Sequence, residues 1–508
     1  MTQGHTRELP VAGARPASEA APVADAFPHT RRPLPWLLAG FMAMVFLIPI
    51  DSTVLKIHLP VDSHIDRFAI VVLLAAWFWF RGDQRAFMRT PRSKLFVTAV
   101  VVYLVLAVAS DLFDAHRLIN LGEQTLPLKQ FALFLSFVVV GWFALTALRF
   151  EDLRGMTTWL IGLGTFDALA MVVERQAGYN VFYTWSAKLL SPIAIVSPSQ
   201  NFGTTSDGRA SVLGPTEHPL AATTLLVMVA PFALVRALDA TNRKDRLRYG
   251  AAAAVMLMAA MATDRKSAFV IPIVVLIYIA WQRPRQIFRF APIWIPLLAI
   301  GVHIAAPGAI GHILQFNNDA NSGSTSHRLG DFSGIAADVN AHPILGRGFG
   351  SIDADQASMF RINDDQYLDE LWAVGALGLV AYIWMLISPV VLARRASRSL
   401  DAVTATVALG ASASCLAFFV SNLLFDALSY PQTPYLFFIV AGMAVTVAAG
   451  PEGNVEPATG VRRLLVMPRP YAGARAAPAL ARATAAAAAQ TGAPPGSKAL
   501  IRPTRSIR

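Results

Sequence analysis

Apolar runs long enough to form helices alternate with short polar segments through most of the chain. A bilayer requires about 20 apolar residues per helical span, so several runs must extend into their flanks. The pattern predicts an all-α fold, a polytopic transmembrane helix bundle of about 12 spans. That count depends on the short polar turn 264–266, which separates two of the runs. The apolar runs are 34–50, 68–80, 95–110, 130–148, 155–173, 218–236, 249–263, 267–282, 288–306, 371–393, 402–424 and 434–449.

The composition indicates a chain that is surrounded mostly by lipid. It is 55% hydrophobic and only 15% charged, whereas soluble proteins are about a quarter charged. These values exclude a disordered protein, a fibrous repeat and an ordinary soluble enzyme. The single cysteine, Cys415, excludes an intramolecular disulfide and a cysteine-rich metal site. Because Cys415 lies in an apolar run, we interpret it as a packing residue.

The positive charge follows the loops on one side of the predicted membrane. A net charge of +11 would indicate a nucleic-acid partner in a soluble protein. In a membrane protein, Lys and Arg collect in the cytoplasmic loops instead, so we expect no nucleic-acid partner. With the N-terminus inside, both termini are cytoplasmic and most bases fall in short inside loops. These bases are Arg81, Arg85, Arg89, Arg92, Lys94, Arg149, Arg154, Arg236, Arg243, Lys244, Arg246, Arg248, Arg283, Arg285, Arg289, Arg394, Arg395 and Arg398.

The chain divides into spans, two terminal tails and two long outer loops. Loops of more than about 12–15 residues usually have a function, so we expect the chemistry in the outer loops. The tails are rich in Ala and Pro, which is typical of disorder. The predicted parts are a disordered cytoplasmic tail 1–33, nine spans over 34–306 with an outer loop 174–217, a large and partly helical outer loop 307–370, three spans over 371–449, and a disordered basic cytoplasmic tail 450–508.

The large outer loop contains a helical pattern, a glycine-rich turn and an acidic helix start. One helical face carries the apolar residues Leu329, Phe332, Ile335 and Val339. The stretch Gly346-Arg347-Gly348 is either a plain turn or a loop whose amides bind a phosphate. Asp365 precedes the next helix, where it either caps the helix or takes a proton from a hydroxyl group.

Four of the cations on the predicted outer side are candidate ligands, because the positive-inside bias disfavours cations there and each needs a reason. Guanidinium groups bind phosphate oxygens through two parallel hydrogen bonds, so a lipid pyrophosphate headgroup in the outer leaflet is their natural ligand. For any one of them the alternative is a salt bridge, for example between Arg265 and Asp264. The four cations are Arg209, Arg265, Lys266 and Arg328.

Two histidines, His218 and His342, precede prolines in the outer segments. Each is either a base or a structural group that is held by hydrogen bonds. No two histidines have the spacing of metal ligands on a helix, so no metal site is expected. Asp167 lies within a span, where a carboxylate is costly. It has either a functional role or a hydrogen bond to a neighbouring helix.

Three motifs occur in order at the predicted outer face. They are Arg209…Gly214…His218-Pro219-Leu220, then Asp264-Arg265-Lys266-Ser267-Ala268, then Arg328…His342-Pro343-Ile344-Leu345-Gly346-Arg347-Gly348 followed by Asp365-Gln366-Tyr367-Leu368 and Gly375-Ala376-Leu377-Gly378-Leu379. Together they resemble the O-antigen ligase and O-antigen polymerase superfamily of bacterial envelope glycosyltransferases. The likeness extends over about 34–449 and is strongest over 205–380.

The resemblance implies a multi-pass glycosyltransferase of the bacterial inner membrane that needs neither a metal nor another cofactor. Its donor would be an oligosaccharide on undecaprenyl pyrophosphate, facing the periplasm. The pyrophosphate would be held by Arg209, Arg265 and Arg328, with help from Lys266. Further site candidates are His218, Arg347 and Tyr367.

One departure from the superfamily bears on the reaction. Ligases that load O-antigen onto lipid A core resemble each other in a His-Asn pair before the span that follows the large loop. The corresponding pair here is Asp365-Gln366, which is similar to the Asp-Asn pattern of some exopolysaccharide polymerases. Asp365 is therefore the preferred base on the acceptor side, and His342 is the second catalytic candidate.

We therefore predict an enzyme that polymerises lipid-linked repeat units at the periplasmic face during exopolysaccharide or O-antigen synthesis. Its partners would be the lipid bilayer, a chain-length co-polymerase and a flippase. An O-antigen ligase that transfers polymer to a lipid or other acceptor is the first alternative. The alternative of another class is a lipid-linked oligosaccharide flippase or transporter. Such a protein should show related halves, and no convincing internal repeat is evident.

Overall fold

Helices form nearly all of the regular structure, as the apolar runs predict. The computed structural model describes residues 26–57, 63–80, 91–120, 125–199, 208–305, 335–350, 365–399 and 401–451. All of them belong to one unit, residues 1–456. The helices are α1 (Pro33–Leu47), α2 (Ile65–Trp79), α3 (Pro91–Phe113), α4 (Ala115–Asn120), α5 (Thr125–Ala147), α6 (Asp152–Ala177), α7 (Val181–Leu189), α8 (Pro219–Asp239), α9 (Arg243–Met261), α10 (Ser267–Gln282), α11 (Pro284–Ala305), α15 (Gln366–Ala373), α16 (Gly375–Ala396), α17 (Ala402–Ser421) and α18 (Gln432–Ala449).

Each of the predicted apolar runs overlaps one of these helices, and the fold is an all-α membrane protein. In the described part of the chain, 7 helices are long and apolar enough to cross a bilayer, namely α3, α5, α6, α8, α16, α17 and α18. The shorter helices α1 and α10 are also apolar. The number of spans beyond these seven stays a prediction. The expected turn at 264–266 is confirmed, because α9 ends at Met261 and α10 begins at Ser267.

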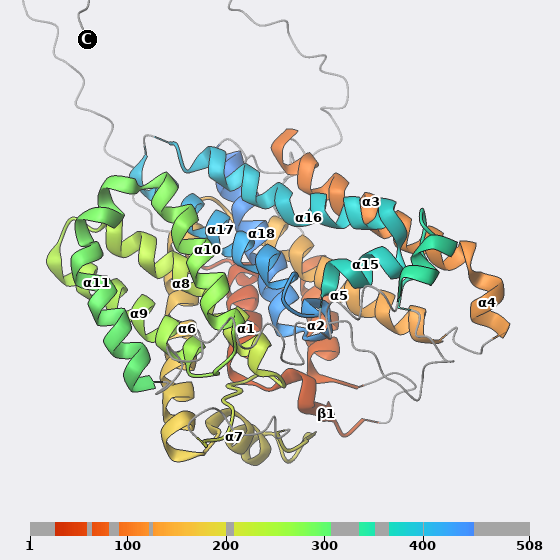
Figure 1. Ribbon diagram of the computed structural model, residues 1–508, viewed down its shortest axis with the longest axis horizontal. Coiled ribbons are helices and arrows are strands. Elements are labelled where there is room, and N and C mark those ends of the chain that lie inside the picture. The colour runs from red at the N-terminus through yellow and green to blue at the C-terminus, as the bar shows by residue number, and fades with distance from the viewer. Residues whose placement is uncertain are drawn as a thin grey trace, which may run out of the picture. The chain divides into compact units, whose positions relative to one another are not determined.

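Helices α8, α17 and α18 form the interior of the described bundle. The apolar window of α18 is 94% buried within the protein, whereas that of α3 is 33% buried and turns most of its surface outward. Figure 1 shows α17 and α18 side by side among the other helices. Because α18 is surrounded by protein, a polar side chain at its ends contacts other helices rather than lipid.

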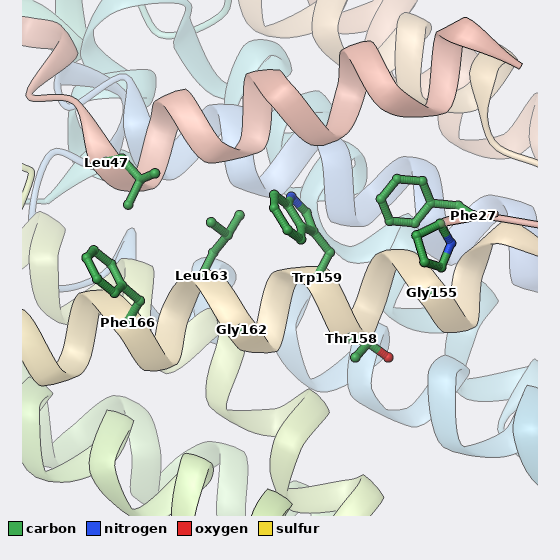
Figure 2. A pocket seen from close by; sticks show the side chains of 9 residues that line it. Phe27, Leu47, Gly155, Thr158, Trp159, Gly162, Leu163 and Phe166 are labelled. Carbon is green, nitrogen blue, oxygen red and sulfur yellow. The ribbon is translucent and has the colours of Figure 1, made fainter. Parts of the chain in front are cut away.

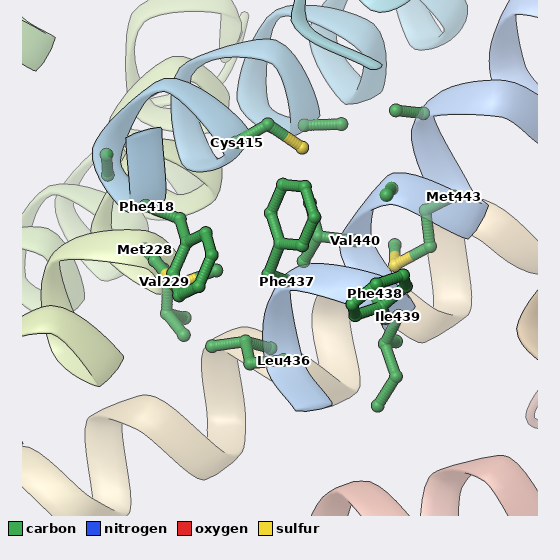
Figure 3. Close-up of a cluster of buried hydrophobic side chains, with 14 of the residues drawn as sticks. Met228, Val229, Cys415, Phe418, Leu436, Phe437, Phe438, Ile439, Val440 and Met443 are labelled. Carbon is green, nitrogen blue, oxygen red and sulfur yellow. The ribbon is translucent and has the colours of Figure 1, made fainter. Parts of the chain in front are cut away.

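Aromatic side chains fill the interior between these central helices. The rings of Phe418 and Phe437 stack with their centroids 4.7 Å apart. Cys415 is fully buried and points toward the same cluster (Figure 3), which fits its interpretation as a packing residue. Gly410 lies against the ring of Phe232, so this close packing of α8 on α17 requires a residue without a side chain.

The short segment before α1 differs from the prediction of a disordered tail over 1–33. In the described part of that tail, Phe27 and Arg32 are buried. The Phe27 amide donates to the Asp152 carboxylate over 3.0 Å, and the Arg32 guanidinium forms an ion pair with it at 2.6 Å. Asp152 is fully buried and requires such partners, so it holds this segment on the bundle. Residues 1–25 and 452–508 of the two predicted tails lie outside the described residues.

A small ribbon crosses one end of the bundle. Strand β1 (Thr53–Leu55) pairs antiparallel with β2 (Ala194–Val196), and Val54 lies opposite Ile195. A single turn of 3-10 helix, η1 (Ile50–Ser52), precedes β1. The ribbon joins the loop after α1 to the loop after α7 and thereby fixes η1 beside the start of α8. The apolar pattern did not predict this element.

Candidate functional site

One end of the bundle brings loops that are far apart in the sequence into contact. Helices α6, α9 and α17 end there, and α8, α10 and α18 begin there. The Thr223 and Thr263 hydroxyls lie 2.8 Å apart, and the Gln432 side chain donates to the Pro215 carbonyl over 3.2 Å. We call this region the loop end. It is the side that the sequence predicts as the outer face.

Arg265 lies in the turn between α9 and α10 at the loop end. Asp264, just before it, has a φ of 55°, in the left-handed region that non-glycine residues rarely adopt. Backbone strain of this kind is often retained at functional sites. Within the described residues the Arg265 guanidinium has no hydrogen bond or ion pair, and its Nε is buried. The alternative salt bridge between Arg265 and Asp264 is therefore not formed.

Burial lowers the pKa of Arg265, and the carboxylate of Asp264 acts in the opposite direction. An arginine starts from a pKa above 12 and stays charged at neutral pH. A partly buried cation without a described counter-ion is costly unless an anion arrives to pair with it. Arg265 therefore has the properties expected of an anion-binding residue.

His218 lies beside Arg265 at the start of α8. Its Nδ1 accepts a hydrogen bond from the Leu220 amide over 3.2 Å, so the side chain caps the helix. Its ring lies 5.1 Å from the ring of Tyr430. Burial, with a smaller contribution from Arg265, lowers the pKa of His218 to about 4. The imidazole is therefore neutral at neutral pH. Because Nδ1 accepts, Nε2 carries the proton and is the donor atom of the ring.

A group of carboxylates lies next to His218. Ser52 of η1 donates to the Glu217 Oε1 over 2.7 Å, and its hydroxyl lies 3.2 Å from that of Tyr183. Burial raises the pKa of Asp51 well above its usual range, and the nearby charges of Glu217 and Asp66 raise it further. Asp51 therefore lies in an environment that disfavours its charged form, close to Glu217.

The short helix α15 is joined to this region through a second single turn, η5 (Ala427–Ser429). The Gln366 amide donates to the Asn422 carbonyl over 2.9 Å, and the Leu428 amide donates to the Gln366 side chain over 3.1 Å. Tyr430 directly follows η5, so the start of α15 indirectly positions the ring that packs on His218.

Asp365, the predicted acceptor-side base, is the N-cap of α15. Its Oδ1 accepts from the Tyr367 amide over 2.9 Å and from the Leu368 amide over 3.4 Å. The capping interpretation is therefore observed, and its catalytic role stays a prediction. The Tyr367 hydroxyl donates to the Phe419 carbonyl over 2.8 Å, which gives that side chain a structural role.

The glycine-rich stretch 346–348 forms a structural junction with the start of α16. The amides of Arg347 and Gly348 donate to the carbonyls of Trp372 and Ala373 over 3.0 and 2.9 Å. The Gly346 amide donates to the carbonyl of His342 over 3.0 Å. All three amides are used by the backbone, so the structure favours the turn over a phosphate-binding loop. A Cβ at Gly346 would overlap the Ala373 carbonyl, which explains the glycine.

Arg347 is held in place at this junction. Its guanidinium pairs with Asp338 and lies 5.5 Å from the centre of the Trp372 ring. Its carbonyl accepts from the Arg117 side chain over 2.6 Å. His342 is partly buried and ends the helical turn 335–341 next to it. Arg347 thus has a counter-ion within the protein, unlike Arg265.

The other predicted cations do not join Arg265 through any described contact. Arg209 is exposed and donates to the Gln176 side chain over 2.8 Å at the end of α6. Lys266 is exposed beside Arg265. Arg328 lies outside the described residues, as does much of the predicted loop 307–370.

Several polar residues at or near the loop end were not selected from the sequence, and Asp167 was selected with two alternatives open. Glu217 and Asp51 were not assigned a role, although Asp51 directly follows the first apolar run and Glu217 precedes His218. Glu370 of α15 accepts from the Tyr103 hydroxyl over 2.6 Å, and burial raises its pKa to about 8. Asp167 is fully buried, and neither carboxylate oxygen has a hydrogen bond in the described part of the chain. Of its two alternatives, the hydrogen bond to a neighbouring helix is therefore not observed, and the functional role stays a prediction.

The fold and the loop end define a multi-pass helical membrane protein with a partly buried cation at one face. Comparison with known proteins finds no matching family model and no curated protein with significant similarity.

Proposed function

We propose that the protein is a membrane glycosyltransferase that uses a saccharide linked to a lipid pyrophosphate. The polymerisation of undecaprenyl-linked repeat units at the periplasmic face is its proposed reaction. The observation that supports this most is the Arg265 guanidinium, which forms no described ion pair or hydrogen bond and lies beside a neutral His218. We call these two residues the anion pair, because together they would bind an anion. A cation and an N–H donor at one face of a membrane bundle suit the pyrophosphate of a lipid donor.

The anion pair would act mainly on the leaving group. As the bond between the sugar C1 and the pyrophosphate oxygen breaks, negative charge develops on that oxygen. Arg265 supplies a full positive charge, and His218 supplies the Nε2 proton without repelling Arg265. Donors that are already positioned where charge develops lower the barrier most.

The acceptor hydroxyl loses a proton as its oxygen forms the new bond to C1. A carboxylate can take this proton. We propose Glu217 for this role, because it adjoins His218 and its Oε1 is oriented by Ser52. The proton then resides on Glu217, and the lipid pyrophosphate leaves with the bonding electrons. Asp365 is the competing candidate from the sequence resemblance.

The test is the size and location of polysaccharide in a deletion strain that carries wild-type protein or Arg265→Ala. Repeat units that remain single on the periplasmic lipid carrier in the variant would support the polymerase. Long chains that accumulate on the carrier and never reach their final acceptor would instead indicate a ligase. Repeat units that stay on the cytoplasmic side would indicate a flippase and contradict the enzyme proposal.

Lys188→Ala is the matched control, because Lys188 is an exposed cation of α7 outside the anion pair. It should retain normal polymer. Arg265→Lys should restore little, because Lys keeps the charge but loses the paired donors of the guanidinium. Normal polymer in both Arg265 variants would contradict the role of the anion pair.

A further inference from the structure

A groove along the outside of α6 and α9 has the dimensions and lining of a lipid site. It consists of two cavities. The first lies between α1 and α6 and has a volume of about 480 Å³. The second lies between α6 and α9 and has a volume of about 530 Å³. Thr158, Gly162 and Phe166 line both cavities, and Figure 2 shows the first of them between α1 and α6. We call the second cavity the α6–α9 groove.

The α6–α9 groove is mostly apolar along its length. Small residues open it: a Cβ at Gly162 would meet no atom within 4 Å. It extends from Thr158 to Leu169, which are about 16 Å apart along a helix that rises 1.5 Å per residue. Half of a bilayer core is about 15 Å thick. The groove therefore matches one acyl chain of a single leaflet.

One mouth of the α6–α9 groove is strongly basic. Arg236 donates to the Thr158 hydroxyl over 2.5 Å and to the Arg154 carbonyl over 2.6 Å, and it lies 5.4 Å from the centre of the Tyr249 ring. Arg248, which lines the groove, is 5.8 Å from the same ring. Arg154 and Arg248 both act electrostatically on Arg236.

This arginine cluster, Arg154, Arg236 and Arg248, has no acidic partner among the described residues. The described ion pairs of the chain do not include any of the three. The described electrostatic neighbours of Arg236 are Tyr249 and the other two arginines. The positive charges of Arg154 and Arg248 repel that of Arg236. An anion that binds between them would remove that repulsion.

We propose that the α6–α9 groove and the arginine cluster together bind an anionic phospholipid. One acyl chain would lie along α6 and α9, and the headgroup phosphate would contact Arg248 and Arg154. The cluster lies at the end of the bundle opposite the loop end, and the sequence predicts this end to be cytoplasmic. Anionic lipids are concentrated in that leaflet. The proposal is independent of the glycosyltransferase function, because it concerns the other end of the protein.

The experiment compares phosphatidylglycerol with phosphatidylcholine as probes of the purified full-length protein. Lipid binding is counted by native mass spectrometry, and the unfolding temperature is recorded with each lipid. Wild type should bind phosphatidylglycerol more tightly and unfold at a higher temperature with it. Arg248→Ala should weaken phosphatidylglycerol binding about five-fold, since each basic side chain near the headgroups contributes about 1 kcal/mol. Its binding of phosphatidylcholine should not change.

Two further variants separate a built site from a diffuse charge effect. Arg243→Ala removes an exposed cation from the start of α9 that does not line the groove, and it should leave the preference intact. Gly162→Leu fills open space and should weaken the binding of both lipids. Inorganic phosphate should not reproduce the stabilisation, because it leaves the groove empty.

Three results would overturn the proposal. The first is equal affinity of the wild type for the two lipids. The second is an equal loss of preference in Arg243→Ala and Arg248→Ala, which would indicate general surface charge. The third is full stabilisation by inorganic phosphate, which would indicate a simple anion site without a lipid chain.

Discussion

Arg265 and Arg347 both lie in predicted outer segments of the sequence, but their surroundings in the structure differ strongly. The sequence selected Arg265 as a pyrophosphate ligand and Arg347 as a further site candidate. Arg347 is paired with Asp338 and packs on Trp372. Arg265 has neither a hydrogen bond nor an ion pair within the described residues. The comparison shows that the presence of a counter-ion, rather than charge or position alone, separates a structural arginine from a binding candidate.

The same comparison extends to the regions around the two arginines, which are the junction of α15 and α16 for Arg347 and the loop end for Arg265. The junction of α15 and α16 is closed by backbone hydrogen bonds and by two glycines in close approach, Gly346 and Gly375. The loop end instead holds a strained turn at Asp264 and a partly buried acid, Asp51, in η1. Stability should therefore depend most on the first region, and chemistry on the second.

The largest effect on stability is expected at the junction. Gly346 has a φ of 70°, and a Cβ there would overlap the Ala373 carbonyl. Gly346→Ala should destabilise the protein by at least about 3 kcal/mol, because strain and overlap add. Thermal unfolding in detergent measures this. Gly40→Ala is the control, since a Cβ at Gly40 meets nothing within 4 Å. Equal unfolding temperatures for the two variants would contradict the close approach.

A smaller loss is expected for Arg347→Ala. The change leaves Asp338 without its partner and removes the contact with Trp372. The cost should be about 2 kcal/mol, because a charge-assisted hydrogen bond is lost at a partly exposed carboxylate. Arg265→Ala should not lower the unfolding temperature, because it removes a partly buried cation that has no ion pair among the described residues. If Arg265→Ala destabilised the protein as much as Arg347→Ala, the distinction between the two arginines would fail.

The His218 pKa gives a dependence of stability on pH. The folded-state pKa of about 4 lies below the unfolded value of about 6.5. Between these values the unfolded chain binds more protons, so stability rises with pH from about 4 to about 6.5. His218→Asn keeps a cap at the start of α8 and should flatten this part of the curve. Unfolding temperatures at several pH values measure it, and an unchanged slope in the variant would count against a buried neutral His218.

The smallest effect is expected at Asp365. Asp365→Ala removes the cap of α15 and should reduce the stability by about 1 kcal/mol, whereas Asp365→Asn keeps a good cap and should reduce it by only a few tenths.

Asp365→Asn should also keep polymer formation, because we assign the proton transfer to Glu217. Glu217→Gln should abolish it without a loss of stability. The opposite pattern of activity would return the catalytic role to Asp365.

The helices were predictable because the apolar runs are long and depend only on local sequence. The turn between α9 and α10 was predicted for the same reason. The cap at Asp365 was visible as one of two alternatives, because an acid before a helix fits both. The sequence resemblance directed attention to Arg265 and His218, but it could not show that Arg265, unlike Arg347, forms no ion pair among the described residues.

The remaining features depend on contacts between distant segments. Ser52 meets Glu217 only because the ribbon of β1 and β2 places η1 beside α8. Arg32 is buried because it pairs with Asp152 at the start of α6, 120 residues further along the chain. No local pattern contains this information, so the contacts of Phe27 and Arg32 with Asp152 and that of Ser52 with Glu217 were not predicted.

Binding of undecaprenyl pyrophosphate to purified protein in nanodiscs tests the central claim most directly. Wild type, Arg265→Ala and the control Lys188→Ala would be compared by titration. Loss of the charge-assisted contact should weaken binding by at least about ten-fold in Arg265→Ala, while Lys188→Ala binds like wild type. Equal affinity of all three proteins would contradict the assignment of Arg265 as the residue that holds the pyrophosphate.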